Sequence, residues 1–538
     1  MEFNNIFEII NFAPPLFFLY TELHYRFPFI PSRYFIKEPE ILSDVPHRIE
    51  PGQDIPFFIL IKDGDEFPID LEKISISIYN DEQSLLKESV SIQETINDHF
   101  WSRTISIPTS NLKGVVLADI QFDYKMNDKI LSCKNHNIKS LKFQPFKINV
   151  SEHPLPGCDQ VQWGDLHYHS NLTEDMVEFG APLKETLSAC KAIGLDFICN
   201  TDHSYDLDDM EGSWTETDPD LKKWKNSRKE IKNLNEEFDF SPFMIPSEEL
   251  TMHNSIGRNV HALILNNDTF LPGRGDGAEN GLDFHSEHNS DTVYSELEEK
   301  ALCIAAHPFV SVPVMQWLFF KRGVWEDYDV LQDRMSGLQI LNGEIDQDFV
   351  RGVKEWVHYL LKGHRKFIYA GNDAHGNFNI FRQIKIPMLK IEQADKQILG
   401  QCRTGVYPDK LNSIESTIEA LRVGNCFITN GPYLNFHLNG TIKMGRELKA
   451  ELAQLQASVL SSPEFGKILG IRVIQGIIGE KKETILYEIV NSNSAYEMEI
   501  SESIPVNKKS YFRVETESEI SGKKHLAMSN PIWVNPSE

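Results

Sequence analysis

The chain has 538 residues, with 53 lysines and arginines against 79 aspartates and glutamates, so its formal net charge is −26. A surface this acidic repels polyphosphate backbones, and we therefore expect no long nucleic acid as a partner. Hydrophobic residues make up 41% of the chain and charged residues 25%, a balance that is typical of a globular protein able to bury a large core.

An apolar stretch near the start, residues 9–19, is too short for a membrane helix and is broken by Pro14 and Pro15. No basic residue precedes this stretch, whereas a secretory signal begins with a positively charged region. The seven cysteines are odd in number and include no CxxC pair, which favours reduced thiols over a disulfide framework. We therefore expect a cytoplasmic protein that does not bind membranes.

Residues 1–153 show the patterns of β-strands. Apolar and polar residues alternate over 74–79 and 115–122, an apolar run covers 57–61, and polar turns such as 63–65 separate these segments. Short strands at close spacing without helical periodicity predict a β-sandwich-like domain.

The pattern changes after Pro154, and residues 154–430 alternate between helical and strand-like segments. Residues 181–193 have helical periodicity and are followed by Gly194, which can cap the end of a helix. Strands that alternate with helices predict a parallel α/β domain. Residues 431–538 return to strand patterns and predict a second β-sandwich-like domain. The strand-like runs of the central part are 195–200, 262–265, 302–306, 338–341 and 367–370.

Five segments of the central domain end an apolar run with side chains that can bind metal ions. In a strand, residues two apart lie on the same face, so both imidazoles of an HxH motif can reach one ion. Each motif alone is common in turns and cores, but their joint occurrence indicates a metal site assembled by the fold. Imidazole and carboxylate ligands suit zinc, manganese, iron or nickel. The candidate ligands are His167, His169, His203, Glu249, His261, His307, Asp373 and His375.

The order of these motifs (HxH, ThrAspHis, Glu, His, AlaHisPro and AspAlaHis) resembles the PHP (polymerase and histidinol phosphatase) superfamily. Three segments, 371–379, 421–432 and 529–534, resemble its carbaryl-hydrolase-like branch of metallohydrolases. The resemblance covers residues 155–538. It implies a distorted (β/α)7 barrel over residues 154–430 that carries two or three divalent ions of zinc, manganese or iron. We expect β-sandwich-like domains over 1–153 and 431–538 to flank this barrel.

The resemblance also implies how the ligands divide among the ions, with one carboxylate shared between two of them. The implied sets are His167, His169, Glu249 and Asp373 for the first ion; Glu249, His261 and His307 for the second; and His203 and His375 with an acidic residue for the third.

Two carboxylates of these sets have a neighbour that competes for the same role. The third set needs an acidic residue where the family has Asp, and the chain offers Glu174 at the matching spacing and Asp175 beside it. Glu248 is the alternative to Glu249. The Glu-Leu-Thr pattern favours Glu249, and adjacent strand residues point to opposite faces, so only one of the two can reach the site.

Two further residues are candidates for catalytic roles. Asp202 precedes His203 and can orient a ligand or shuttle a proton. Arg382 follows the AspAlaHis motif and can hold a substrate anion through two parallel hydrogen bonds, although a surface arginine is the equal alternative. The aromatic stretch 315–320, together with Trp325, either lines a substrate pocket or packs in the core.

Together these patterns predict a metal-dependent hydrolase that acts on a small, anionic molecule. Metal binding lowers the pKa of water from about 16 toward about 7, and the metal-bound hydroxide would attack phosphorus or a carbonyl carbon. The PHP resemblance favours phosphoester hydrolysis, and its carbaryl-hydrolase branch permits carboxyl esters, amides or carbamates. A non-catalytic metal-binding module is the alternative from another class. The full ligand set argues against it, and the sequence leaves the substrate and the oligomeric state open.

Overall fold

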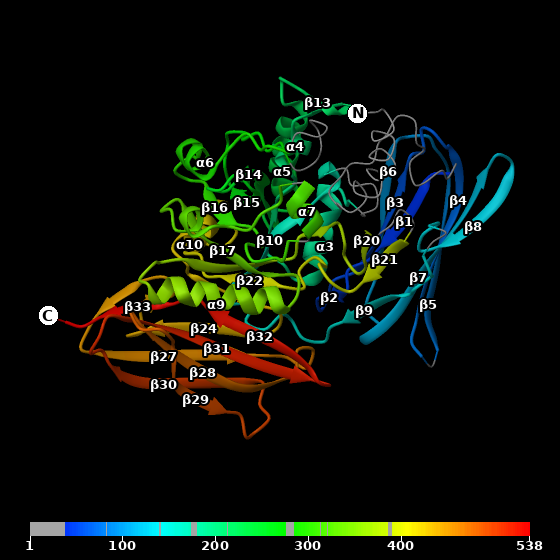
Figure 1. The fold of residues 1–538 in the computed structure, drawn as a ribbon. Helices are drawn as coiled ribbons and strands as arrows, with labels where there is room; N and C mark the ends of the chain where they lie inside the picture. Colours follow the sequence, from blue (N-terminus) through cyan, green and yellow to red (C-terminus); the bar gives the residue numbers. More distant parts are fainter. Residues whose placement is uncertain are drawn as a thin grey trace.

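The computed structural model describes residues 38–81, 83–138, 141–173, 180–211, 213–275, 284–312, 314–319, 321–385 and 390–537. The expected ligand Glu174, its alternative Asp175 and the apolar stretch at 9–19 lie outside these ranges. Figure 1 shows N-terminal strands in blue, a central region in green and yellow, and C-terminal strands in orange and red. The protein is mostly β.

The N-terminal strands form two sheets that enclose one hydrophobic core. One sheet has the order β1-β3-β6, and the other has the order β2-β9-β7-β4-β5 with β8 beside β7. Ile74, Ile76 and Ile78 of β4 are buried between the sheets, because alternate side chains of a strand point to the same face. The strands are β1 (Glu40–Asp44), β2 (Arg48–Ile49), β3 (Ile55–Lys62), β4 (Ile69–Tyr79), β5 (Ser84–Ile96), β6 (Phe100–Ile107), β7 (Gly114–Met126), β8 (Lys129–Lys134) and β9 (Phe146–Val150).

The central region combines strands and helices. Helix α3 ends where the sequence predicts, at Gly194, which has a φ of 86° and donates its N–H to Cys190 O. The elements are β10 (Gln162–His169), η1 (Asn171–Thr173), α3 (Leu183–Ile193), β11 (Phe197–Asn200), α4 (Ser204–Leu207), β12 (Asp209–Met210), β13 (Ser213–Thr217), α5 (Lys222–Glu237), β14 (Phe243–His253), β15 (Asn259–Leu265), α6 (Ser290–Glu296), β16 (Leu302–Ala305), α7 (Val314–Phe319), α8 (Asp327–Val330), β17 (Met335–Asn342), α9 (Gln347–Leu361), β18 (Phe367–Gly371), β19 (Ala374–His375), β20 (Phe381–Lys385), β21 (Lys390–Ala394), β22 (Arg403–Val406), α10 (Ile414–Arg422) and β23 (Cys426–Thr429).

The expected distorted (β/α)7 barrel is wrong. The central strands belong to a mixed sheet of 16 strands, in which β14, β15 and β16 are antiparallel neighbours and β10 is antiparallel to β22. The sheet continues through β22 and β23 into the C-terminal strands β32 (Lys523–Ser529), β31 (Ser510–Ile520), β28 (Lys467–Ile477) and β29 (Thr484–Val490). A βα barrel needs parallel strands with a helix in each connection, whereas the short turn 254–258 joins β14 to β15.

The turn between β14 and β15 is held by Asn254. Its side-chain oxygen accepts hydrogen bonds from the backbone N–H groups of Ile256 (3.2 Å) and Arg258 (2.8 Å). A short turn of this kind reverses the chain, so the strand that follows must run antiparallel. Parallel pairs with helices in their connections are present nearby, for example β10 with β11 through α3 and β17 with β18 through α9.

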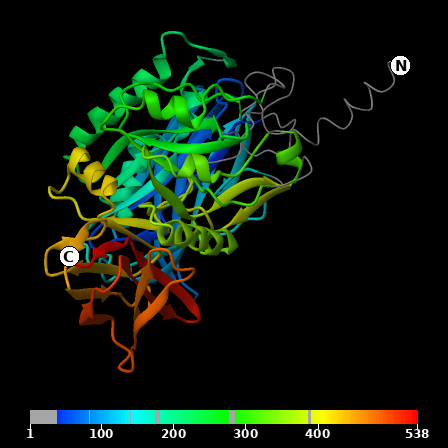
Figure 2. The same ribbon diagram turned by 60° about the vertical axis from the view of Figure 1, so that its left-hand side comes forward.

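The C-terminal strands form two layers around a shared core. The sheet β25-β24-β27-β30 packs on β28, β31 and β32, which continue the central sheet. Helix α9 lies between the central strand β17 and β28 (Figures 1 and 2). The strands are β24 (Tyr433–Leu438), β25 (Ile442–Lys443), β26 (Glu447–Lys449), β27 (Leu452–Leu460), β28 (Lys467–Ile477), β29 (Thr484–Val490), β30 (Glu497–Pro505), β31 (Ser510–Ile520), β32 (Lys523–Ser529) and β33 (Ile532–Asn535).

The division of the chain at residues 153/154 and 430/431 stays a prediction. Among the described residues, none of the helices is both long and apolar enough to span a bilayer.

Candidate metal centre

The ends of neighbouring strands bring the candidate ligands to one edge of the central sheet. His167 and His169 end β10, His203 follows β11, Glu249 lies in β14 and His261 in β15. The strands β10, β11 and β14 are parallel, so their carboxyl ends lie side by side. Crevices outside such strand ends are where α/β sheets bind ligands.

Two of the ligands have a left-handed backbone, which side chains rarely adopt. The φ angle is 28° at His307, after β16, and 52° at Asp373, after β18. Each such residue costs on the order of 1–3 kcal/mol, and they cluster at functional sites. The backbone N–H of Asp373 donates to His167 O at 2.9 Å, and β19 pairs with the end of β10. These contacts hold the end of β18 against the ligands of β10.

Four ligand atoms surround one point. His167 Nε2 and His169 Nε2 lie 3.1 Å apart. Glu249 Oε2 lies 3.3 Å and 3.2 Å from these two nitrogens, and Asp373 Oδ1 lies 3.2 Å and 3.3 Å from them. In a tetrahedral site with bonds of about 2.0–2.1 Å, ligand atoms are about 3.3–3.4 Å apart. The distances therefore fit an ion at the centre of this group.

A chain of hydrogen bonds determines which nitrogen of His167 carries the proton. The carboxylate of Asp373 can only accept hydrogen bonds, so the Asn342 amide turns its NH₂ group toward it, with Nδ2 3.5 Å from Oδ2. Asn342 Oδ1 then accepts from Gln339 Nε2 at 2.9 Å, and Gln339 Oε1 lies 2.9 Å from His167 Nδ1. His167 Nδ1 therefore donates to Gln339, and its Nε2 presents a lone pair.

A second chain does the same for His169. Thr173 Oγ1 donates to Asp202 Oδ1 at 2.9 Å, so the same oxygen accepts from His169 Nδ1 at 3.3 Å. Asp202 is fully buried and also accepts from Ser170 N (2.6 Å), Ser170 Oγ (2.7 Å) and Asn200 Nδ2 (2.6 Å). The structure thus places Asp202 one side chain away from a ligand, where it orients His169 through Thr173.

In these two tautomers, the buried atoms His167 Nε2 and His169 Nε2, which lie 3.1 Å apart, both carry a lone pair. Lone pairs at this distance repel unless a cation or a proton lies between them. The carboxylates that complete the group attract the same cation. A side-chain arrangement of this kind can hold a metal ion, in agreement with the sequence-based expectation of a metal cofactor.

Glu249 joins this group to a second one. Its Oε1 lies 2.9 Å from His261 Nδ1 and 3.2 Å from His307 Nε2, whereas its Oε2 faces the first group and lies 3.2 Å from His203 Nδ1. The atoms of His203, Glu249 and His261 can hold an ion together. One carboxylate with an oxygen toward each group is the arrangement of a bridging ligand.

A third group contains His169, His203 and His375. The rings of His169 and His375 are stacked, with centroids 4.2 Å apart. His203 belongs to both the second and the third group, whereas the resemblance implied that it serves the third ion alone.

The side chains of Glu248 and Glu249 point to opposite faces of β14. Glu248 is buried on the far face, where Arg228 Nη2 lies 4.0 Å from its Oε2. Burial raises the pKa of Glu248 to about 7, although Arg228 opposes this shift. Glu249, the preferred residue, is the one that reaches the histidines.

Opposite charges within the cluster keep its carboxylates and His169 ionised although they are buried. Burial alone would raise the pKa of Glu249, but His261 and His167 hold it well below its usual range. Burial likewise opposes ionisation of Asp373, yet His167 and His169 keep its pKa well below the usual range. Burial is outweighed at His169 by its bonds to Asp373 and Glu249, so its pKa is raised. Protons and metal ions therefore compete for the same nitrogens.

The structure does not bring Arg382 to the ligands. It lies in β20, fully buried, and its Nη2 is 3.4 Å from Ser43 O in β1. Burial lowers the pKa of Arg382, and the carboxylates of Asp44 and Glu40 on that strand oppose the shift. Trp325 is part of the hydrophobic core, whereas Trp317 is 47% exposed and stacks on Arg258.

Sequence patterns missed several residues that contact the ligands, among them Thr173, Gln339 and Arg322. Arg322 Nη1 lies 2.6 Å from His261 Nε2. A single sequence offers no signal for such contacts, because they join side chains that are distant along the chain.

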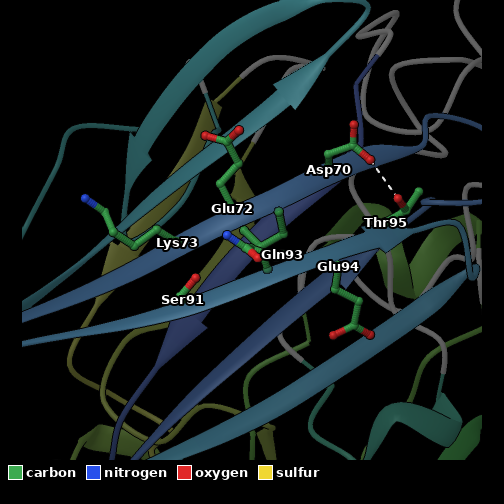
Figure 3. Close-up of a pocket in the computed structure, with 8 residues that line it drawn as sticks. Asp70, Glu72, Lys73, Ser91, Gln93, Glu94 and Thr95 are labelled. Carbon is green, nitrogen blue, oxygen red and sulfur yellow. Dashed lines mark hydrogen bonds between the residues drawn. The ribbon is translucent and has the colours of Figure 1, made fainter.

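A hollow of about 510 Å³ lies far from these ligands, on the N-terminal sheet, where β4 and β5 meet. Figure 3 shows Asp70, Glu72, Lys73 and Glu94 around it, with Asp70 accepting a hydrogen bond from Thr95. Its lining contains no histidine or cysteine, unlike the groups of ligands at the strand ends.

Comparisons with known proteins leave the family open. No family model matches the chain, and no curated protein matches it. Solved structures similar to it include a β-glucuronidase of Bacteroides uniformis, with 11% identity over 92% of this chain and a TM-score of 0.18. A glycosyl hydrolase family 2 member of Bacteroides cellulosilyticus has 10% identity over 94% of this chain and a TM-score of 0.16. The chain covers 61% and 64% of these two proteins, and likenesses at such TM-scores carry no argument.

Proposed function

We propose that the protein is a metal-dependent hydrolase that acts on a small phosphoester. The observation that carries this proposal is the meeting of His167 Nε2, His169 Nε2, Glu249 Oε2 and Asp373 Oδ1, in which each nitrogen lies 3.1–3.3 Å from the other three atoms. Both imidazoles are held with their lone pairs toward that point. Ligands of this type suit zinc, manganese or iron.

The bridging position of Glu249 supports two ions rather than one. Its two oxygens face different histidine groups, and two cations close together need a shared anion to offset their repulsion. Bound ions at such a site supply an activated water as nucleophile and neutralise charge that develops on the substrate oxygen.

The residues of the chain hold and orient the ligands. Gln339 and the pair Thr173 and Asp202 determine the tautomers of His167 and His169. Partners of this kind typically change metal affinity by about 10–100-fold when removed.

Phosphoester chemistry is supported by the motif order, which resembles the PHP superfamily; membership of that superfamily is part of this proposal. A net charge of −26 disfavours a long polyanion as substrate and favours a small one, whose charge the ions offset locally.

The test is to measure bound metal and hydrolysis on the same protein. Folded protein supplemented with zinc or manganese should carry at least two ions per chain by elemental analysis. It should hydrolyse chromogenic phosphate esters, and a chelator should abolish this activity. Less than one ion per chain would contradict the proposal. Hydrolysis of a naphthyl carbamate but of no phosphate ester would show carbonyl chemistry instead.

A further inference from the structure

Arg322 lies beside Asn259 at the start of β15, close to the ligand His261. The backbone N–H of Asn259 donates to Lys321 O, and that of Gly323 donates to Asn259 O, both at 2.9 Å. These bonds place Arg322 opposite Asn259, two residues before His261 on the same face of the strand. Gly323 is required here, because a Cβ atom would come within 2.3 Å of Arg258 Cβ.

The contact between Arg322 and His261 determines the proton on the imidazole. Arg322 Nη1 lies 2.6 Å from His261 Nε2 and Nη2 lies 3.4 Å from Nδ1, so the guanidinium faces both ring nitrogens and is closer to Nε2. A guanidinium can only donate, whereas the carboxylate of Glu249 beside Nδ1 can only accept. His261 Nε2 therefore accepts, and its proton is on Nδ1. That N–H donates to Glu249 Oε1 at 2.9 Å.

This contact and a metal ion on His261 exclude each other. If an ion binds Nε2, it needs the lone pair that Arg322 uses. If an ion binds Nδ1, the proton must move to Nε2, and two donors would then face each other at 2.6 Å. Either nitrogen leads to the same result, because a neutral imidazole has one lone pair and one proton on its nitrogens.

We propose that Arg322 and the second metal ion compete for His261, and that the guanidinium released by the ion binds the phosphate group of the substrate. This inference rests on the proposed function, since it assigns a role at the second ion of that centre. The released side chain remains tethered at the start of β15, beside the ions. A guanidinium beside two cations is stabilised by an anion, and its planar fork matches two phosphate oxygens.

The competition is tested by metal titration. Purified protein, stripped of metal, is titrated calorimetrically with manganese alone, in parallel with Arg322→Met and Arg322→Gln. Both variants should bind the second ion roughly tenfold more tightly, with the first ion unchanged, because they remove the competitor for His261. Arg258→Met is the matched control, because Arg258 also lies at the start of β15 but contacts Trp317. It should bind both ions as the wild type does.

The phosphate role is tested with inorganic phosphate. Phosphate should bind the manganese-loaded wild type at least tenfold more tightly than manganese-loaded Arg322→Met, while Arg258→Met should match the wild type. Unchanged affinity for the second ion in both Arg322 variants would overturn the competition. Equal phosphate affinity would overturn the anion role.

These outcomes separate the inference from the function it builds on. If the wild type binds two ions and hydrolyses phosphate esters while Arg322→Met has unaltered affinities, the inference fails and the hydrolase stands. If phosphate esters are not hydrolysed but the Arg322 variants bind the second ion more tightly, the competition stands and the proposed activity fails.

Discussion

The protein buries charge in two regions, and it neutralises the charge differently in each. In the C-terminal region, Arg513 donates from Nε to Glu483 Oε1 (2.7 Å) and from Nη2 to Glu483 Oε2 (2.6 Å), and it also contacts Glu515. These ion pairs contain their own cation, and the glutamates raise the pKa of Arg513 despite its burial. At the strand ends, Glu249 and Asp373 instead face imidazole nitrogens held with their lone pairs inward.

The difference shows how a buried structural ion pair can be told from a binding site. A guanidinium between two carboxylates has satisfied its donors, and adding a metal ion there would remove hydrogen bonds. Imidazole lone pairs and carboxylates that converge on one point repel one another, and a bound cation relieves this repulsion. The first region should therefore contribute to folding, and the second to metal binding.

The largest effect is expected at the bridging carboxylate. Glu249→Gln keeps the shape of the side chain but removes the charge that both metal groups share. It should lower turnover by several orders of magnitude and reduce the number of bound ions, measured by kinetics and elemental analysis. Glu248→Gln is the control on the opposite face of β14 and should retain its metal. Reversed phenotypes would show that Glu248 is the ligand.

The next effect tests the other region. Arg513→Met leaves Glu483 and Glu515 without their buried partner, and breaking such a pair typically costs about 3–5 kcal/mol. The free energy of unfolding in urea should fall by roughly 3 kcal/mol, while the folded protein binds as many ions as the wild type. Loss of metal from folded Arg513→Met would remove the distinction between the two regions.

A smaller effect is expected from the residue that orients His167. Gln339→Leu removes the acceptor for His167 Nδ1, so the imidazole loses its fixed tautomer. Affinity for the first ion should weaken by about 10–100-fold, as seen for outer-shell partners of other metal ligands. Gln339→Glu restores an acceptor and should recover most of the affinity in a metal titration. Equal affinities in all three proteins would contradict the role of Gln339.

The smallest effect concerns His525, a buried histidine of the C-terminal region. Burial lowers the pKa of His525 to about 4, although its bond to Asn430 O opposes this shift. Because the folded pKa lies below the unfolded value of about 6.5, stability is present above pH 6.5 and is lost as the pH falls toward 4. Between pH 7 and pH 5, the free energy of unfolding of His525→Gln should therefore fall by roughly 1–2 kcal/mol less than that of the wild type, measured by urea unfolding. An unchanged acid slope would show that His525 is not buried as a neutral group.

Strand register explains why sequence patterns located much of the metal centre. The two-residue period of a strand places His167 and His169 on one face and separates Glu249 from Glu248, and these relations hold whichever way the neighbouring strands run. The same local rule underlies the end of α3 at Gly194.

The features that the sequence predicted wrongly depend on contacts between segments that are distant along the chain. Arg382 was expected near the ligands because it follows the AspAlaHis motif closely, but β20 carries it to Asp44 of the N-terminal sheet. The barrel was expected from the resemblance to the PHP superfamily, and a parallel α/β domain was expected because apolar runs alternate with helical segments. An apolar run does not encode the direction of its neighbour, and the turn at Asn254 reverses β15.

By itself, the sequence determined which side chains can bind metal, on which strand faces they lie, and that the chain is acidic and rich in strands, because these properties are local or additive. Only the tertiary structure decided that those strands form a mixed sheet, that Gln339 and Thr173 orient the ligand imidazoles, and that Arg322 contacts His261. These are pairings between residues far apart in the chain, and they are set by packing and hydrogen-bond geometry, which a single sequence does not display.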